Sequence, residues 1–223
     1  MLTAGFVLLE ALLIGFVDRP VAEGMHALDQ SHPAIVDFFR AYTDFGKSKW
    51  YLWPSGLMIV ALALAARNAT IPSRLRVKIA HAGNKLMFFF VAIAVSGIVT
   101  DIIKPILGRA RPVELLRENI YGFHPFSFHA AWNSMPSGHA TTAFALAAIL
   151  CIQLPRWRFL WLALGLVLAI SRIVVDAHYI SDVVAGAAVG ILSVIALRRM
   201  FQRKEIFPMM RCIFPIDKND FIL

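Results

Sequence analysis

Long apolar blocks separated by polar connectors run through the whole chain. Six such blocks can be marked, at about residues 1–19, 50–66, 86–104, 137–154, 158–176 and 177–197. A helix that crosses a bilayer needs about 20 predominantly apolar residues, within a range of roughly 17–25. Each block therefore predicts one transmembrane helix. The last two blocks almost touch, which predicts a tight turn at Asp176-Ala177-His178.

The first block also has some features of a cleaved signal peptide, because it is apolar and of modest length. It lacks a positively charged leading segment, however, and Glu10 interrupts its apolar core. Both features are unusual in signal peptides. We expect an uncleaved membrane anchor.

Lysine and arginine are distributed unevenly over the connectors. The connector 67–85, the turn 155–158 and the segment after residue 197 are basic with almost no acidic residues, whereas the connectors 18–49 and 101–136 mix both signs. The basic connectors fall on one side of a six-helix bundle, and this bias marks the cytoplasmic side. We expect both termini in the cytoplasm and the two long loops outside.

The first outer loop contains a stretch with helical spacing. Between Pro33 and Phe45 the apolar residues recur on one side, and Asp37, Arg40 and Asp44 supply a polar side. Such a helix can lie in the membrane interface, or it can pack on the rest of the loop. We expect an interfacial helix here.

Composition agrees with a membrane protein. Hydrophobic residues make up 59% and charged residues 16% of the chain, against roughly 45–50% and about 25% in soluble domains. The mean hydropathy is +0.68. These values exclude a disordered chain, a disulfide scaffold and an ordinary soluble enzyme. We predict an all-α, polytopic membrane domain over residues 1–204 and a cytoplasmic tail over 205–223.

Charge and cysteine usage exclude two further classes. The net charge is +8, but the basic residues lie in short connectors and not on one continuous face, so nucleic-acid binding is not indicated. Cys151 and Cys212 form no metal-binding or disulfide pattern, and we interpret both as free thiols.

Three polar clusters lie at helix ends that the predicted topology brings to the outer face. They are Lys104 with Arg111-Pro112, then Pro136-Ser137-Gly138-His139, and finally Ser171-Arg172 with His178 and Asp182. Charges near membrane depth are costly and usually functional.

Each cluster also has a purely structural explanation. Lys104 can extend to the interface. Ser134 can cap a helix that begins near Pro136, and Arg172 can pair with Asp176. These explanations do not account for every cluster falling on the same side of the membrane, so we favour one shared site.

The clusters together fit phosphoryl transfer. A phosphate ester needs several fixed cations to offset its charge and that of the transition state, and Lys104, Arg111 and Arg172 can supply them. Backbone N–H groups around Ser137 and Gly138, at a helix start, form an anion site. Gly138 permits close approach of the phosphate to the backbone.

The histidines complete this chemistry. A neutral His178 can attack phosphorus, and Asp182, one helical turn further on, can fix its tautomer and stabilise the cation that forms. His139 is then available to protonate the departing alkoxide.

The three motifs, in this order and with these internal spacings, resemble the signature motifs of the type 2 phosphatidic acid phosphatase superfamily. The likeness covers roughly residues 100–185 by motif and the whole chain by its six-span layout. It implies phosphate binding by Lys104, Arg111 and Arg172 with help from Ser137 and Gly138, a phosphohistidine at His178 oriented by Asp182, and His139 as general acid. It also implies catalysis without a metal or another cofactor, and the sequence lacks an acidic cluster that could hold Mg²⁺.

Two positions bear on this likeness. Ile180 stands where the family often has proline, and we expect it to alter local stiffness only. Arg109 competes with Arg111, but the spacing from Lys104 and the following Pro112 select Arg111.

We therefore expect an integral-membrane phosphatase that hydrolyses a phosphate monoester or diphosphate on a lipid headgroup, with its site facing the periplasm from a bacterial inner membrane. The substrate candidates are phosphatidic acid, phosphatidylglycerol phosphate, a polyprenyl diphosphate and the phosphate of lipid A. We expect the bilayer and the lipid as partners, and neither nucleic acid nor an obligate protein partner. A vanadium haloperoxidase has similar motifs but is a large soluble protein. An anion transporter would leave the His–Asp pair unexplained.

Overall fold

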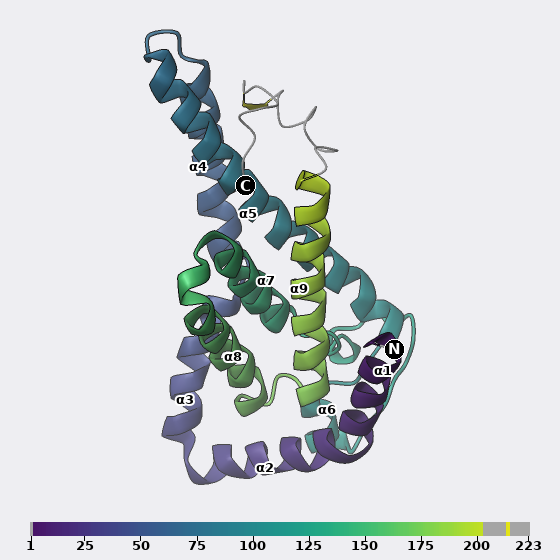
Figure 1. Ribbon diagram of the computed structural model, residues 1–223. Coiled ribbons are helices and arrows are strands. Elements are labelled where there is room, and N and C mark those ends of the chain that lie inside the picture. Colours follow the sequence, from purple (N-terminus) through teal and green to yellow (C-terminus); the bar gives the residue numbers. More distant parts are fainter. Residues whose placement is uncertain (1, 203–212, 215–223) are drawn as a thin grey trace.

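A computed structural model describes residues 2–202 and 213–214, and every regular element in these residues is a helix (Figure 1). The α-helices are α1 (Leu2–Leu12), α2 (Asp18–Ser31), α3 (Pro33–Tyr42), α4 (Lys49–Arg67), α5 (Ser73–Leu107), α6 (Pro112–Glu118), α7 (Gly138–Gln153), α8 (Arg158–Val174) and α9 (Ile180–Gln202). A π-helical turn, η1 (Leu13–Val17), joins α1 to α2, and the short 3-10 turns are η2 (Thr43–Gly46), η3 (Ala130–Trp132) and η4 (Pro155–Trp157). The prediction of an all-α protein is confirmed.

Four segments of the described chain are long and apolar enough to cross a membrane: Pro33–Arg67, Ser73–Leu107, Pro155–Val174 and Ile180–Gln202. The helix α7 is apolar but has only 16 residues, and α1 has 11. Six crossings therefore stay a prediction. The short length of α7 has a structural context, because α7 packs against α5, α8 and α9 in the middle of the bundle.

Helix boundaries differ from the apolar blocks. The helix α5 begins at Ser73 and has 35 residues, so most of the predicted connector 67–85 is helical. The turn between α8 and α9 is as tight as predicted. Asp176 adopts φ 52°, and the N–H groups of Ala177 and His178 both donate to the Arg172 carbonyl, at 3.1 and 3.2 Å.

The first outer loop is also helical. The helix α3 occupies the stretch predicted to be amphipathic, with Val36 buried and Phe38 exposed. The sequence did not predict α2, which lies across the end of the bundle below α8 and α9 in Figure 1. The first residue of α2, Asp18, is buried.

The helices α7 and α9 approach each other closely because α9 carries glycines where they meet. A Cβ atom at Gly186 would lie 2.5 Å from the Ser137 carbonyl oxygen, and one at Gly190 would lie 2.4 Å from the Thr141 carbonyl oxygen. Small residues four positions apart permit such backbone contact between membrane helices. The contact joins two predicted site residues, since the Ser137 N–H donates to the Asp182 carbonyl at 2.9 Å.

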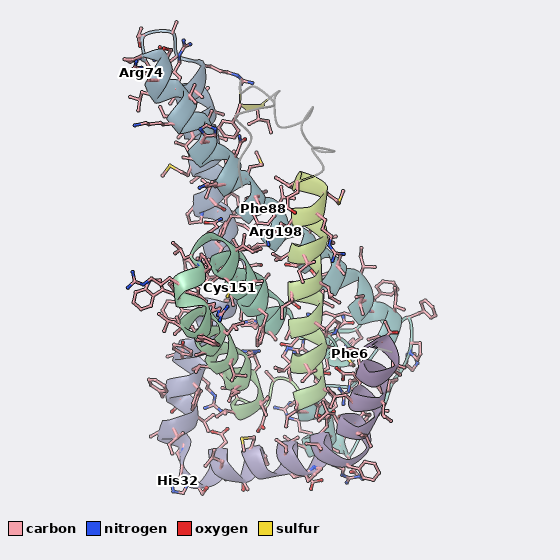
Figure 2. The ribbon with its side chains drawn as sticks, viewed as in Figure 1. Phe6, His32, Arg74, Phe88, Cys151 and Arg198 are labelled. Carbon is pink, nitrogen blue, oxygen red and sulfur yellow. The ribbon has the colours of Figure 1, made fainter. Side chains whose placement is uncertain are left out.

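The basic connectors lie at the end of the bundle opposite α2. Figure 1 shows the α4–α5 turn, the α7–α8 turn and the end of α9 directed away from α2, and in Figure 2 Arg74 and Arg198 lie far from His32. Most of the predicted tail, Cys212 included, lies outside the described residues, but Phe214 is buried against Gly83 of α5. Cys151 is a free thiol, as predicted.

Candidate active site

The structure brings the three polar clusters to the same end of the bundle, near α2. Lys104 lies in the last turn of α5, and Arg111 directly precedes α6. Ser137 caps α7, and Gly138 and His139 are its first residues. Arg172 lies in the last turn of α8, His178 in the α8–α9 turn and Asp182 in the first turn of α9.

His178 is 4% exposed, and its ring is held through Nδ1. This atom lies 3.5 Å from Asp182 Oδ2 and 3.5 Å from the Ser134 hydroxyl. The same Asp182 oxygen accepts hydrogen bonds from Ser134 Oγ at 2.5 Å and from the Tyr179 N–H at 2.9 Å. Several donors favour the ionised form of a carboxylate. A proton on Nδ1 is therefore directed to Asp182, which presents Nε2 as the nucleophilic atom.

Arg109 holds the second oxygen of Asp182. Its guanidinium is 1% exposed and lies 2.6 Å from Asp182 Oδ1 and 2.6 Å from Asp18 Oδ2. Burial alone lowers the pKa of Arg109, but the attraction of Asp182 and the hydrogen bond to Asp18 outweigh it, and the pKa is raised overall. Two carboxylates thus already neutralise Arg109, which agrees with the choice of Arg111 for the phosphate.

Asp18 connects α2 to the start of α9. Its Oδ1 accepts the Ser181 N–H at 3.0 Å, and its Oδ2 accepts the Ser181 hydroxyl. Sequence reasoning missed Asp18 and the role of Arg109, and it considered Ser134 only as a helix cap and not as a partner of Asp182. The available signal for Asp18 was an acidic residue at the end of an apolar block, but its partners lie far away in the chain.

Arg111 and Arg172 contact only neutral groups among the described residues. Arg111 donates to the carbonyl oxygens of Ala130 and Asn133 at 3.0 and 3.3 Å. Arg172 donates to the Thr43 hydroxyl at 2.9 Å. Burial lowers the pKa of Arg111, as expected for a charge without a close counterion.

The alternative pairing of Arg172 with Asp176 is wrong. Asp176 instead lies 3.3 Å from His26 Nδ1, so the carboxylate is engaged by α2 and not by the end of α8.

Lys104 is the third cation of the site. Its nearest carboxylate, Asp101, is 4.0 Å away with a side chain that is 78% exposed. The ammonium lies beside Gly138, where a Cβ atom would be 3.6 Å from Nζ. Lys104 also interacts electrostatically with Arg111 and Arg172. Because these like charges repel one another, a bound phosphate would relieve the repulsion.

The start of α7 differs in detail from the prediction. Ser137, and not Ser134, caps the helix, accepting the Ala140 N–H at 3.4 Å. The Ser137 N–H already donates to Asp182. The anion site at this helix start therefore begins with the N–H groups of Gly138 and His139, which have no acceptor within the helix.

Two buried ring or guanidinium nitrogens of the site have no hydrogen-bond partner within the described chain: His139 Nε2 and Arg172 Nε. Burying a donor or acceptor without a partner is costly, so these atoms point to a ligand that contacts them when bound. His139 is held against η2, where a Cβ atom on Gly46 would lie 2.7 Å from the ring. A cavity of about 270 Å³ between η2, α4, α5 and α7 includes His139 in its lining.

No group of three or more His, Cys, Asp or Glu side chains that could hold a metal ion occurs within residues 2–202 and 213–214. Arg172 Nε and the cations described above are donors, which suits an anion.

Comparison with known proteins adds independent findings. Residues 85–206 match the model of the PAP2 superfamily. The lipid A 1-phosphatase of Rhizobium etli is 32% identical over 157 residues, which cover 70% of this chain and 67% of that protein.

Two solved structures share the fold. LpxE from Aquifex aeolicus aligns with a TM-score of 0.55 and 21% identity, over 79% of this chain and 93% of that chain. The first transmembrane PAP2 type phosphatidylglycerolphosphate phosphatase from Bacillus subtilis aligns with a TM-score of 0.56 and 18% identity, over 90% of this chain and 96% of that chain.

Proposed function

The chain belongs to the PAP2 superfamily and is a bacterial membrane lipid phosphatase, and from this premise we propose that it hydrolyses a lipid headgroup phosphate through a phosphohistidine at His178. One observation carries the proposal. Three cations share a site with a histidine whose Nδ1 is held by a buried carboxylate: Arg111 and Arg172, which contact only neutral groups among the described residues, and Lys104, whose one nearby carboxylate is the exposed Asp101 at 4.0 Å.

The reaction has two steps. The lone pair of His178 Nε2 attacks phosphorus, the bond from phosphorus to the lipid oxygen breaks, and that oxygen takes a proton from the His139 imidazolium. A lipid alcohol leaves. Water then gives a proton to His139 and attacks phosphorus, the P–N bond breaks, and inorganic phosphate is released. Asp182 stabilises the positive charge on the His178 ring while the phosphoryl group is bonded to Nε2.

The cations and the helix start act on the phosphoryl oxygens. Lys104, Arg111 and Arg172 offset the charge that these oxygens carry in the transition state, and Gly138 presents its N–H to one of them. Ser137 supports this role by capping α7. We propose that none of these steps needs a divalent metal or another cofactor.

We propose the phosphate of lipid A as the substrate, because the similar Rhizobium etli protein is named a lipid A 1-phosphatase. Phosphatidic acid, phosphatidylglycerol phosphate and a polyprenyl diphosphate complete the panel to be compared. Assays in EDTA test the independence from metal. Absence of phosphate release from all four lipids would contradict the proposal and favour the anion transporter.

We also propose that the chain crosses the bacterial inner membrane six times and that the site faces the periplasm. The basic connectors support this orientation, since they lie at the end of the bundle opposite α2.

Separate tests on the two histidines distinguish their roles. We expect His178→Ala and His139→Ala both to lose nearly all turnover of a natural lipid. General acid catalysis contributes typically about 10²–10⁴-fold, and it matters less when the leaving oxygen is a stable anion. The His139→Ala protein should therefore recover substantially on an aryl phosphate with an acidic phenol, whereas His178→Ala should not.

Trapping of labelled phosphoprotein checks the same assignment. The label should form in His139→Ala and be absent from His178→Ala. Label that persists in His178→Ala and disappears in His139→Ala would reverse the assignment, and label unaffected by either substitution would exclude a phosphohistidine at these positions.

A further inference from the structure

A groove opens between α8 and α9 at the end of the bundle opposite the candidate active site. Both helices pack extensively on α7 but make few contacts with each other. The cavity between them has a volume of about 490 Å³, and all three helices contribute to its lining. The apolar lining includes Ile152, Leu162 and Ile195, and Figure 2 labels two further lining residues, Cys151 and Arg198.

The lining residues of α9 follow one another at helical spacing. Ile191, Val194 and Ile195 are followed in the next turn by Arg198 and Arg199. Because residues three and four positions apart lie on one face of a helix, the two arginines continue the apolar stripe toward the end of α9. The groove is therefore apolar along its length and cationic at its outer end.

Three arginines border this cationic end. They are Arg198 and Arg199 of α9 and Arg158 in the first turn of α8. The groove lining contains no acidic residue, and none of the three guanidinium groups forms an ion pair with another described residue. An arginine can bind two oxygens of one phosphate group through parallel N–H bonds. The outer end of the groove therefore suits an anionic phosphate.

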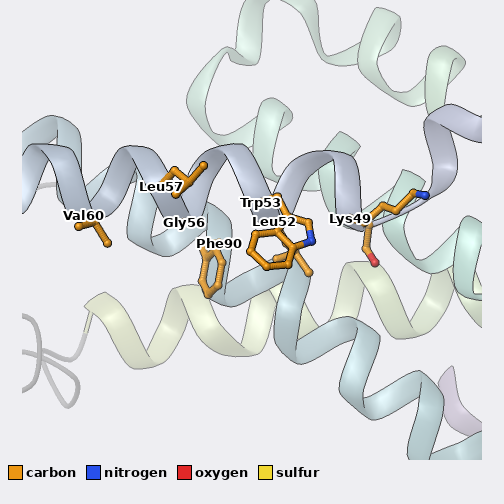
Figure 3. A pocket seen from close by; sticks show the side chains of 8 residues that line it. Lys49, Leu52, Trp53, Gly56, Leu57, Val60 and Phe90 are labelled. Atoms are coloured by element: carbon orange, nitrogen blue, oxygen red, sulfur yellow. The ribbon is translucent and has the colours of Figure 1, made fainter.

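Charge alone at this end of the bundle does not produce such a groove. The retention of basic connectors in the cytoplasm already accounts for cations here, but Arg74 and Arg76 lie at the same end in the first turn of α5 and do not line the groove. An apolar groove along α4, shown in Figure 3, has a similar volume of about 460 Å³, but its lining carries one cation, Lys49. The groove between α8 and α9 combines an apolar lining with three cations.

We propose that the groove between α8 and α9 binds an anionic phospholipid from the leaflet opposite the active site. The arginines bind the headgroup phosphate, and one hydrocarbon chain lies against the apolar lining. From Arg199 back to Ile191, α9 extends roughly 12 Å at about 1.5 Å per residue. One leaflet contributes about half of the roughly 30 Å hydrocarbon core, so the groove follows most of its depth. Basic pockets between transmembrane helices are known to bind anionic headgroups in this way.

This lipid is distinct from the substrate. The groove shares no lining residue with the cavity at His139. The headgroup of phosphatidylglycerol is a phosphodiester, which offers oxygens to the arginines but is neither a phosphate monoester nor a diphosphate. The bound lipid would contact α7, α8 and α9, whose opposite ends carry His139, Arg172 and Asp182. The inference does not depend on the chemistry proposed for those residues.

Cys151 provides a native reporter, because it is a free thiol that lines the groove. Cys212→Ser removes the other cysteine of the chain. The rate at which Cys151 reacts with N-ethylmaleimide is then measured for the purified protein in dodecylmaltoside micelles. With phosphatidylglycerol at about ten times its Kd, we expect the reaction to slow about tenfold relative to the same amount of phosphatidylcholine. The deacylated headgroup, glycerophosphoglycerol, should not slow it, because it has no hydrocarbon chain.

Two double variants with the same charge change test the arginines. Arg198→Gln/Arg199→Gln in the Cys212→Ser background should abolish the protection, so that the rates in phosphatidylglycerol and phosphatidylcholine agree. Arg74→Gln/Arg76→Gln removes the same charge from the same end of the bundle and should keep the protection. Melting temperatures of both variants without lipid check that they fold.

Several results would overturn the inference. Equal protection in the two double variants would mean that the surface charge of the micelle slows the reaction. Equal protection by phosphatidylcholine would identify bulk lipid, and equal protection by glycerophosphoglycerol would identify a soluble anion. The last two comparisons use the Cys212→Ser protein alone and do not depend on folding of the arginine variants. None of these measurements involves phosphate release, so the proposed function is tested separately.

Discussion

Two arginines that are two residues apart have different environments and, we expect, different roles. Arg109 is neutralised by Asp18 and Asp182, whereas Arg111 contacts only carbonyl oxygens among the described residues. Removing a buried cation that has counterions destabilises the fold, because the counterions are left buried without a partner. A buried cation without a counterion is instead available to bind an anion.

Substitution by methionine separates these roles. We expect Arg109→Met to lower the free energy of unfolding by about 3–5 kcal/mol, because it leaves two buried carboxylates without their cation. Arg111→Met should leave stability unchanged or slightly higher, because it removes one of several like charges. It should reduce kcat by at least about 10²–10³-fold.

Thermal unfolding in detergent and turnover of the same preparations test this pair. A stable, inactive Arg109→Met protein together with an active Arg111→Met protein would reverse the two assignments.

Local spacing predicts Arg111 as the phosphate-binding arginine, because Lys104, Arg111 and Pro112 lie within one short segment. The roles of Asp18 and Ser134 could not be predicted in this way. Asp18 is 91 residues from Arg109 in the chain, and Ser134 is 48 residues from Asp182. Their chemistry depends on contacts that no local pattern specifies.

At the scale of elements, the contact between α7 and α9 positions the site. It brings Ser137 at the start of α7 against Asp182 in the first turn of α9, and it depends on Gly186 and Gly190. Any separation of the two helices would therefore move the start of α7, where we propose that the phosphate binds, away from the His178–Asp182 pair.

Alanine at position 190 tests this dependence. A Cβ atom there would lie 2.4 Å from a backbone oxygen, so we expect Gly190→Ala to cost roughly 1–3 kcal/mol of stability through overpacking and to reduce activity. Gly24→Ala is the matched control, because a Cβ atom at Gly24 meets nothing within 4 Å. Alanine favours a helix over glycine by roughly 0.5–1 kcal/mol, so the control should be at least as stable as the wild type. Equal melting temperatures for the two variants would contradict the close-packing argument.

The apolar blocks predicted the existence of most helices better than their ends. A block ends where the residues become polar, but a helix ends where its backbone hydrogen bonding ends. The helix α5 therefore begins at Ser73, well before its apolar block. Conversely, the first block is divided by the π-helical turn Leu13–Val17, which apolar character does not reveal.

At the scale of the whole molecule, the proposed orientation makes a prediction about accessibility. In a variant without Cys151 and Cys212, we expect a cysteine at Pro125 to react in intact spheroplasts with a membrane-impermeant thiol reagent. A cysteine at Pro72 should react only after the membrane is permeabilised. The reason is that residue 72 lies in a basic connector, which is retained in the cytoplasm.

Permeabilised spheroplasts serve as the control, in which both cysteines should react. Reaction at residue 72 but not at residue 125 in intact spheroplasts would place the site on the cytoplasmic side.

The all-α class and the family likeness follow from composition and from spacing within short segments, and the same spacing predicts the cations and histidines of the site. Three features become visible only when the helices pack together: Arg109 is neutralised by Asp18 and Asp182, the Ser137 N–H donates to the Asp182 carbonyl, and a cavity between η2, α4, α5 and α7 includes His139 in its lining. These features arise where segments distant in the chain come into contact. A side chain's charge is a local property, but its counterion, its burial and the cavity beside it depend on which helices pack together.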